Sequence, residues 1–318
     1  MSEKIIYILS CTESGGIYSC SFNEDNKLKI IGKTAADRPM YAVLSGGRLY
    51  VILREPFGKN NKESGIVSFK AESGVLTDKT DLASTKGEVC CHLCVSNEDI
   101  YAANYISGSI IKMPDKLVRH CGGSINPERQ GSPHTHFTNF TPDGKYICVA
   151  DLGTDKIFIY DRELRPVSET AVTPGSGPRH IAFSDNGKYA YCVNELSSTV
   201  TVLLYDNGKM QPLCEYSTVP CDYRGNNAPA AIRYYGGCVY VSNRGHDSIA
   251  SFKADGDKLI LTDIVPCGGK SPRDFNIWNG RLICTNEESN NACLFLINNG
   301  GLTLSDEIRI EKPLCVVC

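Results

Sequence analysis

The chain has 318 residues, of which 42% are hydrophobic and 22% charged, with a formal net charge of −3. This balance is that of an ordinary globular protein without a low-complexity tail. A net negative chain does not attract polyanions, so we expect no nucleic-acid partner, and an anionic ligand would need a local cluster of arginines. The opening MSEKIIYILS is too acidic and too short in apolar residues for a secretory signal, and no later run reaches about 18 apolar residues. We therefore expect a cytoplasmic protein with no membrane partner.

A unit of roughly 40 to 50 residues recurs along the chain, which is the period of propeller blades. The chain opens with three strand-like runs in residues 5–33. Six further units follow, and they begin at Arg38, Cys91, Ser132, Gly177, Ala228 and Ser271. The units at Ser132 and Gly177 are the clearest, because each has three alternating apolar runs separated by turns such as TPDG and SDNG. Asp, Asn and Gly in these turns favour tight hairpins, and a fourth, outer strand follows in each unit.

The first unit lacks a leading strand, and the last residues, KPLCVVC, resemble a leading strand without the rest of a unit. Together they complete a seventh blade. The sequence therefore predicts one domain over residues 1–318, an all-β seven-bladed propeller of four-stranded blades. The C-terminal strand is expected to pair with the N-terminal strands and close the ring. A β-sandwich would not predict this permutation of the repeat between the two ends.

The 16 cysteines lie in strand-like runs, which favours reduced thiols in the core over disulfides. Cys91 and Cys94 form one CxxC pair, and Cys315 and Cys318 form another, but residues three apart on a strand point to opposite faces. An HxH pair at 134–136 has no further ligands nearby in sequence. We therefore predict no metal and no cofactor. The sequence also has no GxSxG, HExxH, P-loop or strand-bound GxGxxG motif.

In a propeller the leading strand of each blade is innermost, so residues near its start line the channel mouth. Four side chains there, or just after the second strand, are the predicted catalytic group: His136, Arg179, Glu195 and Arg244. Arginines bind carboxylate or phosphate with paired donors, and a nearby His or Glu can take a proton from water.

Arg273 and His134 are predicted to join Arg179 and Arg244 in binding substrate. Strand alternation predicts that His180 points away from Arg179. Further polar residues at these turns are expected to pin one blade to the next, namely Asp151, Asp155, Asn194, Asn243 and Asp247.

The stretch GSGPRHIAFSDNGKYAYCVNEL closely resembles the propeller-type 6-phosphogluconolactonase family, as do PHTHFTNFTPDGKYICVADLGTDKI, VSNRGHDSI and SPRDFNI. The likeness spans almost the whole chain. The same family includes fungal carboxy-muconate cyclases, which also act on lactones. Carried over by motif, the family's site falls on the same four predicted catalytic residues. One departure is Ala231, where the family usually has an acidic residue.

The resemblance implies hydrolysis of 6-phospho-D-glucono-1,5-lactone to 6-phosphogluconate, a step of the pentose phosphate pathway. The implied partner is thus a small phosphorylated sugar lactone, and we expect a monomer or weak homodimer. Two alternatives remain open: a lactonase or lactonising enzyme for another sugar acid or a carboxy-muconate-like acid, and a non-catalytic interaction propeller. The residues leave open whether Glu195 or His136 is the general base. They also leave open whether Ala231 makes the protein slow, selective for another substrate, or inactive.

Overall fold

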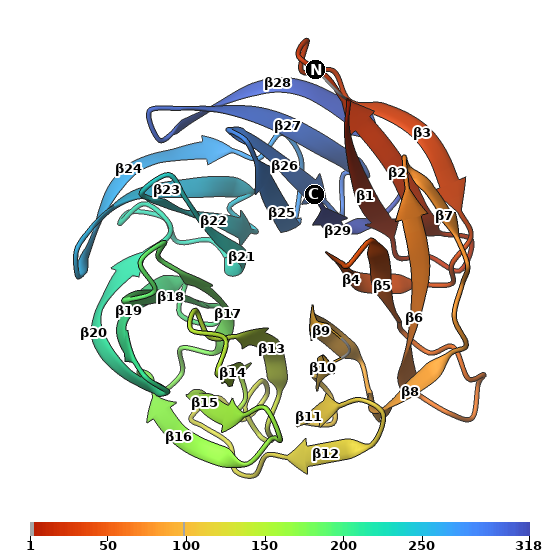
Figure 1. The fold of residues 1–318 in the computed structure, drawn as a ribbon. Helices are drawn as coiled ribbons and strands as arrows, with labels where there is room; N and C mark the ends of the chain where they lie inside the picture. The colour runs from red at the N-terminus through yellow and green to blue at the C-terminus, as the bar shows by residue number, and fades with distance from the viewer. Residues whose placement is uncertain (1–2, 98) are drawn as a thin grey trace.

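The computed structural model describes residues 3–97 and 99–318 of the protein, and every regular element in these ranges is a β-strand. Seven antiparallel sheets are arranged as a ring (Figure 1), and their leading strands line a central channel. The predicted seven-bladed propeller is therefore confirmed. No helix among the described residues could cross a membrane.

Each blade is a four-stranded meander with its leading strand at the channel. The first blade consists of β29 (Pro313–Val317), β1 (Lys4–Ser10), β2 (Gly16–Phe22) and β3 (Lys29–Thr34). The second consists of β4 (Pro39–Ser45), β5 (Arg48–Leu53), β6 (Glu63–Glu72) and β7 (Val75–Thr77), and β8 (Ala83–Glu88) pairs with β6 as an additional strand. The third consists of β9 (Cys90–Ser96), β10 (Asp99–Asn104), β11 (Ser109–Lys112) and β12 (Lys116–Arg119).

The other four blades follow in chain order. They are β13 (Thr135–Phe140), β14 (Tyr146–Asp151), β15 (Lys156–Asp161) and β16 (Pro166–Ala171); β17 (Pro178–Phe183), β18 (Tyr189–Asn194), β19 (Thr199–Asp206) and β20 (Lys209–Ser217); β21 (Ala228–Tyr235), β22 (Cys238–Arg244), β23 (Ser248–Asp255) and β24 (Lys258–Pro266); and β25 (Pro272–Trp278), β26 (Arg281–Asn286), β27 (Asn291–Asn298) and β28 (Gly301–Arg309).

The ring closes within the first blade. Strand β29 pairs antiparallel with β1, and the register places Tyr7 opposite Val317 and Leu9 opposite Cys315. The two ends of the chain thus share one sheet, as the permuted repeat predicts. This pairing leaves no unpaired leading edge at the place where the chain begins and ends.

The repeated turns have the same geometry in neighbouring blades. In residues 141–144 the Gly144 N–H donates to Thr141 O at 2.8 Å, and in residues 184–187 the Gly187 N–H donates to Ser184 O at 2.8 Å. Both glycines have a φ of 68°, a left-handed conformation that glycine adopts at little cost. These short turns set the hairpin register and therefore the height at which each strand starts.

Every leading strand carries a β-bulge at its start. The pairing register skips one residue in six blades and two in the blade of β21. The skipped residues are Met40, Cys91, His136, Arg179, Ala230 with Ala231, Arg273 and Leu314. A bulge leaves the extra residue out of the ladder and re-aims its side chain. Here the bulges form a ring at one end of the channel.

The core consists of apolar layers between adjacent blades. One layer joins Cys148 and Ile159 of one blade to Cys192 and Leu203 of the next. All 16 cysteines are free thiols, and most are buried in such layers, as expected for reduced cysteines that fill core space.

Leu314→Ala tests the closing strand. Leu314 is 7% exposed in β29 and packs in one apolar cluster with residues of the second and third blades, so its truncation should lower the free energy of unfolding by about 2–5 kcal/mol. The matched control is Leu304→Ala in β28, which is 50% exposed and should change it by no more than about 0.5 kcal/mol. Urea denaturation measures both. Equal effects of the two variants would contradict a structural role for β29.

Candidate active site

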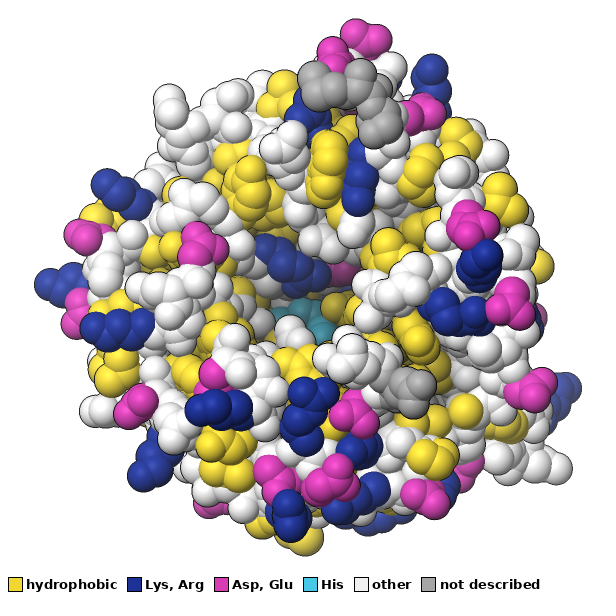
Figure 2. All heavy atoms as spheres, in the orientation of Figure 1, with side chains coloured by type: hydrophobic (Ala, Val, Ile, Leu, Met, Phe, Trp, Pro, Cys, Tyr) yellow, Lys and Arg dark blue, Asp and Glu magenta, His cyan; other side chains and the backbone are white. Residues whose placement is uncertain are grey.

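The channel has two ends, which we call the upper mouth, where the leading strands begin, and the lower mouth, where they end. Figures 1 and 2 view the molecule from the lower mouth. The bulge ring lies near the upper mouth. Residues that directly follow the second strands reach the same end, because those strands run antiparallel to the leading strands.

Glu195 is the centre of the site at the upper mouth. Its Oε2 accepts a hydrogen bond from Arg179 Nε at 2.9 Å and lies 2.8 Å from Arg244 Nη2. Its Oε1 accepts a hydrogen bond from Arg129 Nη2 at 2.7 Å. Three arginines against one glutamate give this group a net charge of +2 (+3 − 1). The group is therefore suited to an anionic ligand.

Local structure brings Arg179 and Glu195 together. Gly177 has a φ of 66°, and a Cβ there would come within 2.6 Å of the Leu196 side chain. Its N–H donates to Asp155 Oδ1, and its carbonyl accepts from the Glu195 N–H at 2.8 Å. The glycine turn thus ties the start of β17 to the residue that follows β18.

Burial and the surrounding charges fix the ionisation of this group. Burial alone would raise the pKa of Glu195, but the charges of Arg244 and Arg179 outweigh it and hold the pKa well below its ordinary value. Burial and the nearby charge of Arg244 lower the pKa of Arg179 to about 9. Both side chains therefore remain charged at neutral pH.

His136 lies beside this group as a neutral imidazole. Burial first, and then the charge of Arg179, hold its pKa well below 6.5. Its Nδ1 is 3.7 Å from the Cys91 thiol, and its Nε2 has no hydrogen-bond partner among the described side chains. A small cavity of about 20 Å³ lies between His136, Arg179, Cys91 and Arg273, and this is room for about one water molecule.

The two other predicted substrate-binding residues lie at the edge of the site. Arg273 is a bulge residue whose Nη1 is 3.7 Å from Glu287 Oε2, and it borders the same small cavity as Arg179. His134 instead stacks on the Tyr105 ring and places its Nδ1 3.0 Å from the Tyr105 carbonyl. The structure thus brings Arg273 to the cluster, whereas the contacts of His134 are with Tyr105.

The expectation that His180 points away from Arg179 is wrong. His180 Nε2 lies 3.2 Å from Arg179 Nη1, and both residues line the small cavity. The physical reason is the bulge at Arg179, which interrupts the strict alternation of the strand. The same effect places Tyr41 beside Met40 and Asp274 beside Arg273 in the channel wall.

Arg129 is the site residue that the repeat pattern missed. It lies in residues 120–134, the long connection between β12 and β13, and its side chain is 42% exposed, against 3% for Arg179 and 16% for Arg244. Arg129 Nη2 also contacts Tyr105 Oη at 3.4 Å. A long irregular connection in a compact fold is often functional, and that signal could have pointed to this loop.

Four of the five polar residues that were expected to pin one blade to the next do so. Asp155 accepts the N–H groups of Gly175 and Gly177 from the next blade, and Asp247 accepts the N–H of Ser271. Asn243 Nδ2 donates to Thr218 O at 2.8 Å. Two of these contacts hold the segments just before Arg179 and Arg273. These hydrogen bonds between blades therefore also position Arg179 and Arg273.

Asp151 Oδ2 contacts the His120 imidazole, which directly follows the preceding blade, whereas Asn194 bonds within its own blade. Asp151 Oδ1 accepts the His134 and Gly153 N–H groups, and Asn194 Nδ2 donates to the Thr201 hydroxyl.

Ala231 lies outside the channel wall. It is fully buried in the apolar layer with Tyr240 and Phe275, and its N–H donates to Ser242 Oγ. Arg179 Nη1 donates to the carbonyl of the preceding Ala230 at 2.7 Å. The only acidic partner of Arg179 among the described residues is therefore Glu195.

No group of three His, Cys, Asp or Glu side chains within residues 3–97 and 99–318 is arranged to hold a metal ion.

Fold and site together define a seven-bladed propeller with an arginine–glutamate–histidine cluster in its channel. The chain belongs to the lactonase family: the model of that family, "Lactonase, 7-bladed beta-propeller", matches residues 5–318.

An uncharacterized protein of Staphylococcus aureus strain USA300 is 35% identical to this chain, over 98% of each chain. A solved structure of a Lactobacillus plantarum protein is 29% identical, with a TM-score of 0.91 and 99% of each chain covered. A candidate 6-phosphogluconolactonase of Bacteroides fragilis is 28% identical, with a TM-score of 0.88, over 99% of this chain and 97% of that one.

Glu195→Gln tests the ionised centre of the cluster. Because the pKa of Glu195 in the folded protein lies below its ordinary value of 4.5, its charge stabilises the fold above about pH 5, and this contribution is lost as the pH falls toward the lowered pKa. Wild type should therefore lose more unfolding free energy between about pH 5 and pH 3 than the variant. Urea denaturation at both pH values measures the difference. Parallel losses would contradict an ionised Glu195.

Proposed function

We propose that this protein hydrolyses 6-phospho-D-glucono-1,5-lactone to 6-phosphogluconate in the cytoplasm. The observation that carries the proposal is the net positive cluster at the upper mouth with a neutral histidine beside it. Membership of the lactonase family supports lactone hydrolysis, and the similarity to the Bacteroides fragilis protein supports a phosphorylated substrate.

The arginines of the cluster have separate roles in this proposal. Arg129 is the most exposed of them and would bind the substrate phosphate as it enters. Arg244 Nη2 faces Glu195 as an ion pair and Nε donates to the Ala228 carbonyl, which leaves Nη1 to donate to a substrate oxygen. Arg179 and Arg244 would stabilise the negative charge that develops on the lactone carbonyl oxygen.

His136 is the general base in this mechanism. Both Glu195 oxygens contact arginines, and its very low pKa makes the carboxylate a weak base. Water attacks the lactone carbonyl carbon and gives a proton to His136. The bond from that carbon to the ring oxygen then breaks, and His136 returns the proton to the ring oxygen. Glu195 holds the arginines in position and favours the charged histidine that forms between the two steps.

His136→Gln should lower kcat for 6-phosphogluconolactone by about 10²- to 10⁴-fold, the usual contribution of a positioned base. Because the pKa of His136 lies well below 6.5, wild-type activity should stay level from about pH 8 to pH 6 and fall only at more acid pH. The assay follows lactone disappearance, corrected for spontaneous hydrolysis. A wild type that matches buffer would refute the reaction, and a folded variant with wild-type kcat would refute the assignment of the base.

Arg129→Gln should raise KM for 6-phosphogluconolactone about tenfold or more, because a hydrogen bond to a charged group contributes about 1.5–3 kcal/mol. The effect on unphosphorylated D-glucono-1,5-lactone should be smaller. Arg165→Gln is the matched control, since Arg165 is 74% exposed and pairs with Asp161 at the edge of a blade. Equal effects on the two lactones would show that Arg129 does not recognise the phosphate.

A further inference from the structure

The lower mouth of the channel contains a second cavity, of about 440 Å³. Figure 2 shows a hollow at the centre of this face, with arginine or lysine and histidine side chains at its floor. Its walls are the later residues of the leading strands, whereas the Glu195 cluster lies beyond their starts. A volume of this size is typical of sites for small molecules.

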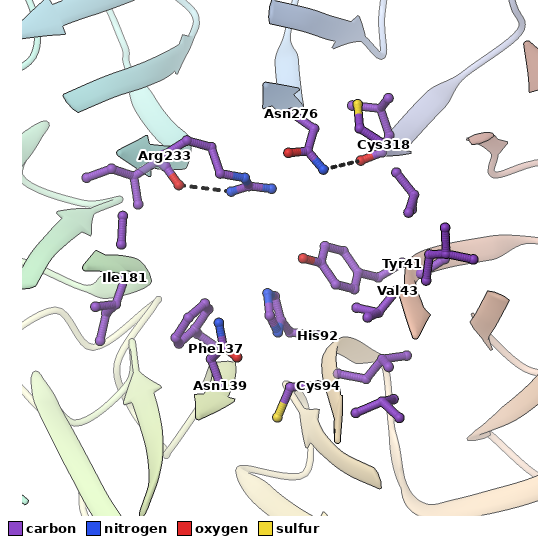
Figure 3. A pocket seen from close by; sticks show the side chains of 18 of the residues that line it. Tyr41, Val43, His92, Cys94, Phe137, Asn139, Ile181, Arg233, Asn276 and Cys318 are labelled. Carbon is purple, nitrogen blue, oxygen red and sulfur yellow. Dashed lines mark hydrogen bonds between the residues drawn. The ribbon is translucent and has the colours of Figure 1, made fainter. Parts of the chain in front are cut away.

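The cavity combines aromatic rings with polar groups. Tyr41 stacks on the His92 ring at 4.3 Å between centroids, and the Phe137 ring lies 4.5 Å from His92 on the other side. Figure 3 shows the Arg233 guanidinium and the Tyr41 hydroxyl reaching into the open space above His92, with Asn139 and Asn276 at its sides. Flat rings beside hydrogen-bonding groups match a ligand that has C–H faces and hydroxyl edges.

Two observations indicate that the polar groups are prepared for a ligand. His92 is 4% exposed, and its Nδ1 is buried without a hydrogen-bond partner among the described residues. Arg233 donates through Nη2 to Asp274 and through Nη1 to the Ile232 carbonyl. It has no other hydrogen-bond partner among the described residues. Its other N–H donors can serve a ligand.

The charges of the cavity select against anions. Arg233 is paired with Asp274 at 2.9 Å, so the floor has no excess positive charge. Burial and then the charge of Arg233 hold the pKa of His92 well below 6.5, which keeps the ring neutral. The upper mouth, in contrast, has a net charge of +2 (+3 − 1) from three arginines and Glu195. An anionic ligand would therefore find compensating charge at the upper mouth and not on the floor of this cavity.

We propose that the lower cavity is a second ligand site for a neutral, polyhydroxylated molecule of monosaccharide size. The ring of the sugar stacks on Tyr41 and Phe137, and its hydroxyls bond to Arg233, Asn139 and His92. This site does not depend on the hydrolytic activity of the upper mouth.

Saturation-transfer difference NMR with D-glucose tests the site. Wild type is expected to transfer saturation to glucose, and Asn139→Trp, which fills the exposed rim of the cavity, should abolish the transfer. The matched control is Gln211→Trp, which adds the same ring to an exposed position of the outer strand β20 and should retain it. Glu195→Gln should also retain it.

Absence of transfer with wild type would overturn the proposal. So would transfer that survives in Asn139→Trp but is lost in Glu195→Gln, because that would place glucose at the upper mouth. If Asn139→Trp does not fold, Asn139→Ala gives a second test, since it removes an exposed amide that the proposal places against the sugar hydroxyls. Unchanged transfer in folded Asn139→Ala would then overturn the proposal.

Discussion

Each leading strand gains an extra residue at its start, and the polar channel depends on this irregularity. A regular strand would send alternate side chains into the channel and into the layers between blades. The bulge instead lets two successive residues, such as Arg179 and His180, line the channel. Bulge residues of six blades line this narrow ring, whereas those of β21 are alanines, and differences in blade sequence decide the chemistry of the ring.

The chemistry at the upper mouth follows from placing several like charges around one buried opposite charge. A single buried ion pair has a large desolvation cost, which good geometry and further hydrogen bonds must offset. Glu195 meets three arginines, so each carboxylate oxygen is engaged and the surplus charge is positive. The carboxylate therefore holds the arginine donors in place, and the His136 imidazole beside it remains neutral in this field.

The sequence was sufficient for the architecture, because the repeat, its turns and its permuted ends are local patterns. It also predicted that Arg179, Glu195 and Arg244 lie near one another at the channel, because they occupy recurring positions in their units. The prediction that His180 points away from Arg179 was wrong. The bulge at Arg179 depends on how β17 pairs with β18, and the residues of β17 alone do not reveal it. Arg129 was missed because its loop lies outside the repeat.

The closing strand has a consequence for synthesis of the protein. Strands β1 to β3 leave the ribosome first, but their inner partner, β29, is made last. The inner edge of the first blade therefore stays unpaired while the other six blades form. An unpaired strand edge can pair with another chain and lead to aggregation. Native closure is the most non-local pairing in the chain, so we expect it to come late in folding. The blade that carries Arg179 and Glu195 is complete before that event, yet the channel around it becomes a closed ring only when β29 pairs with β1.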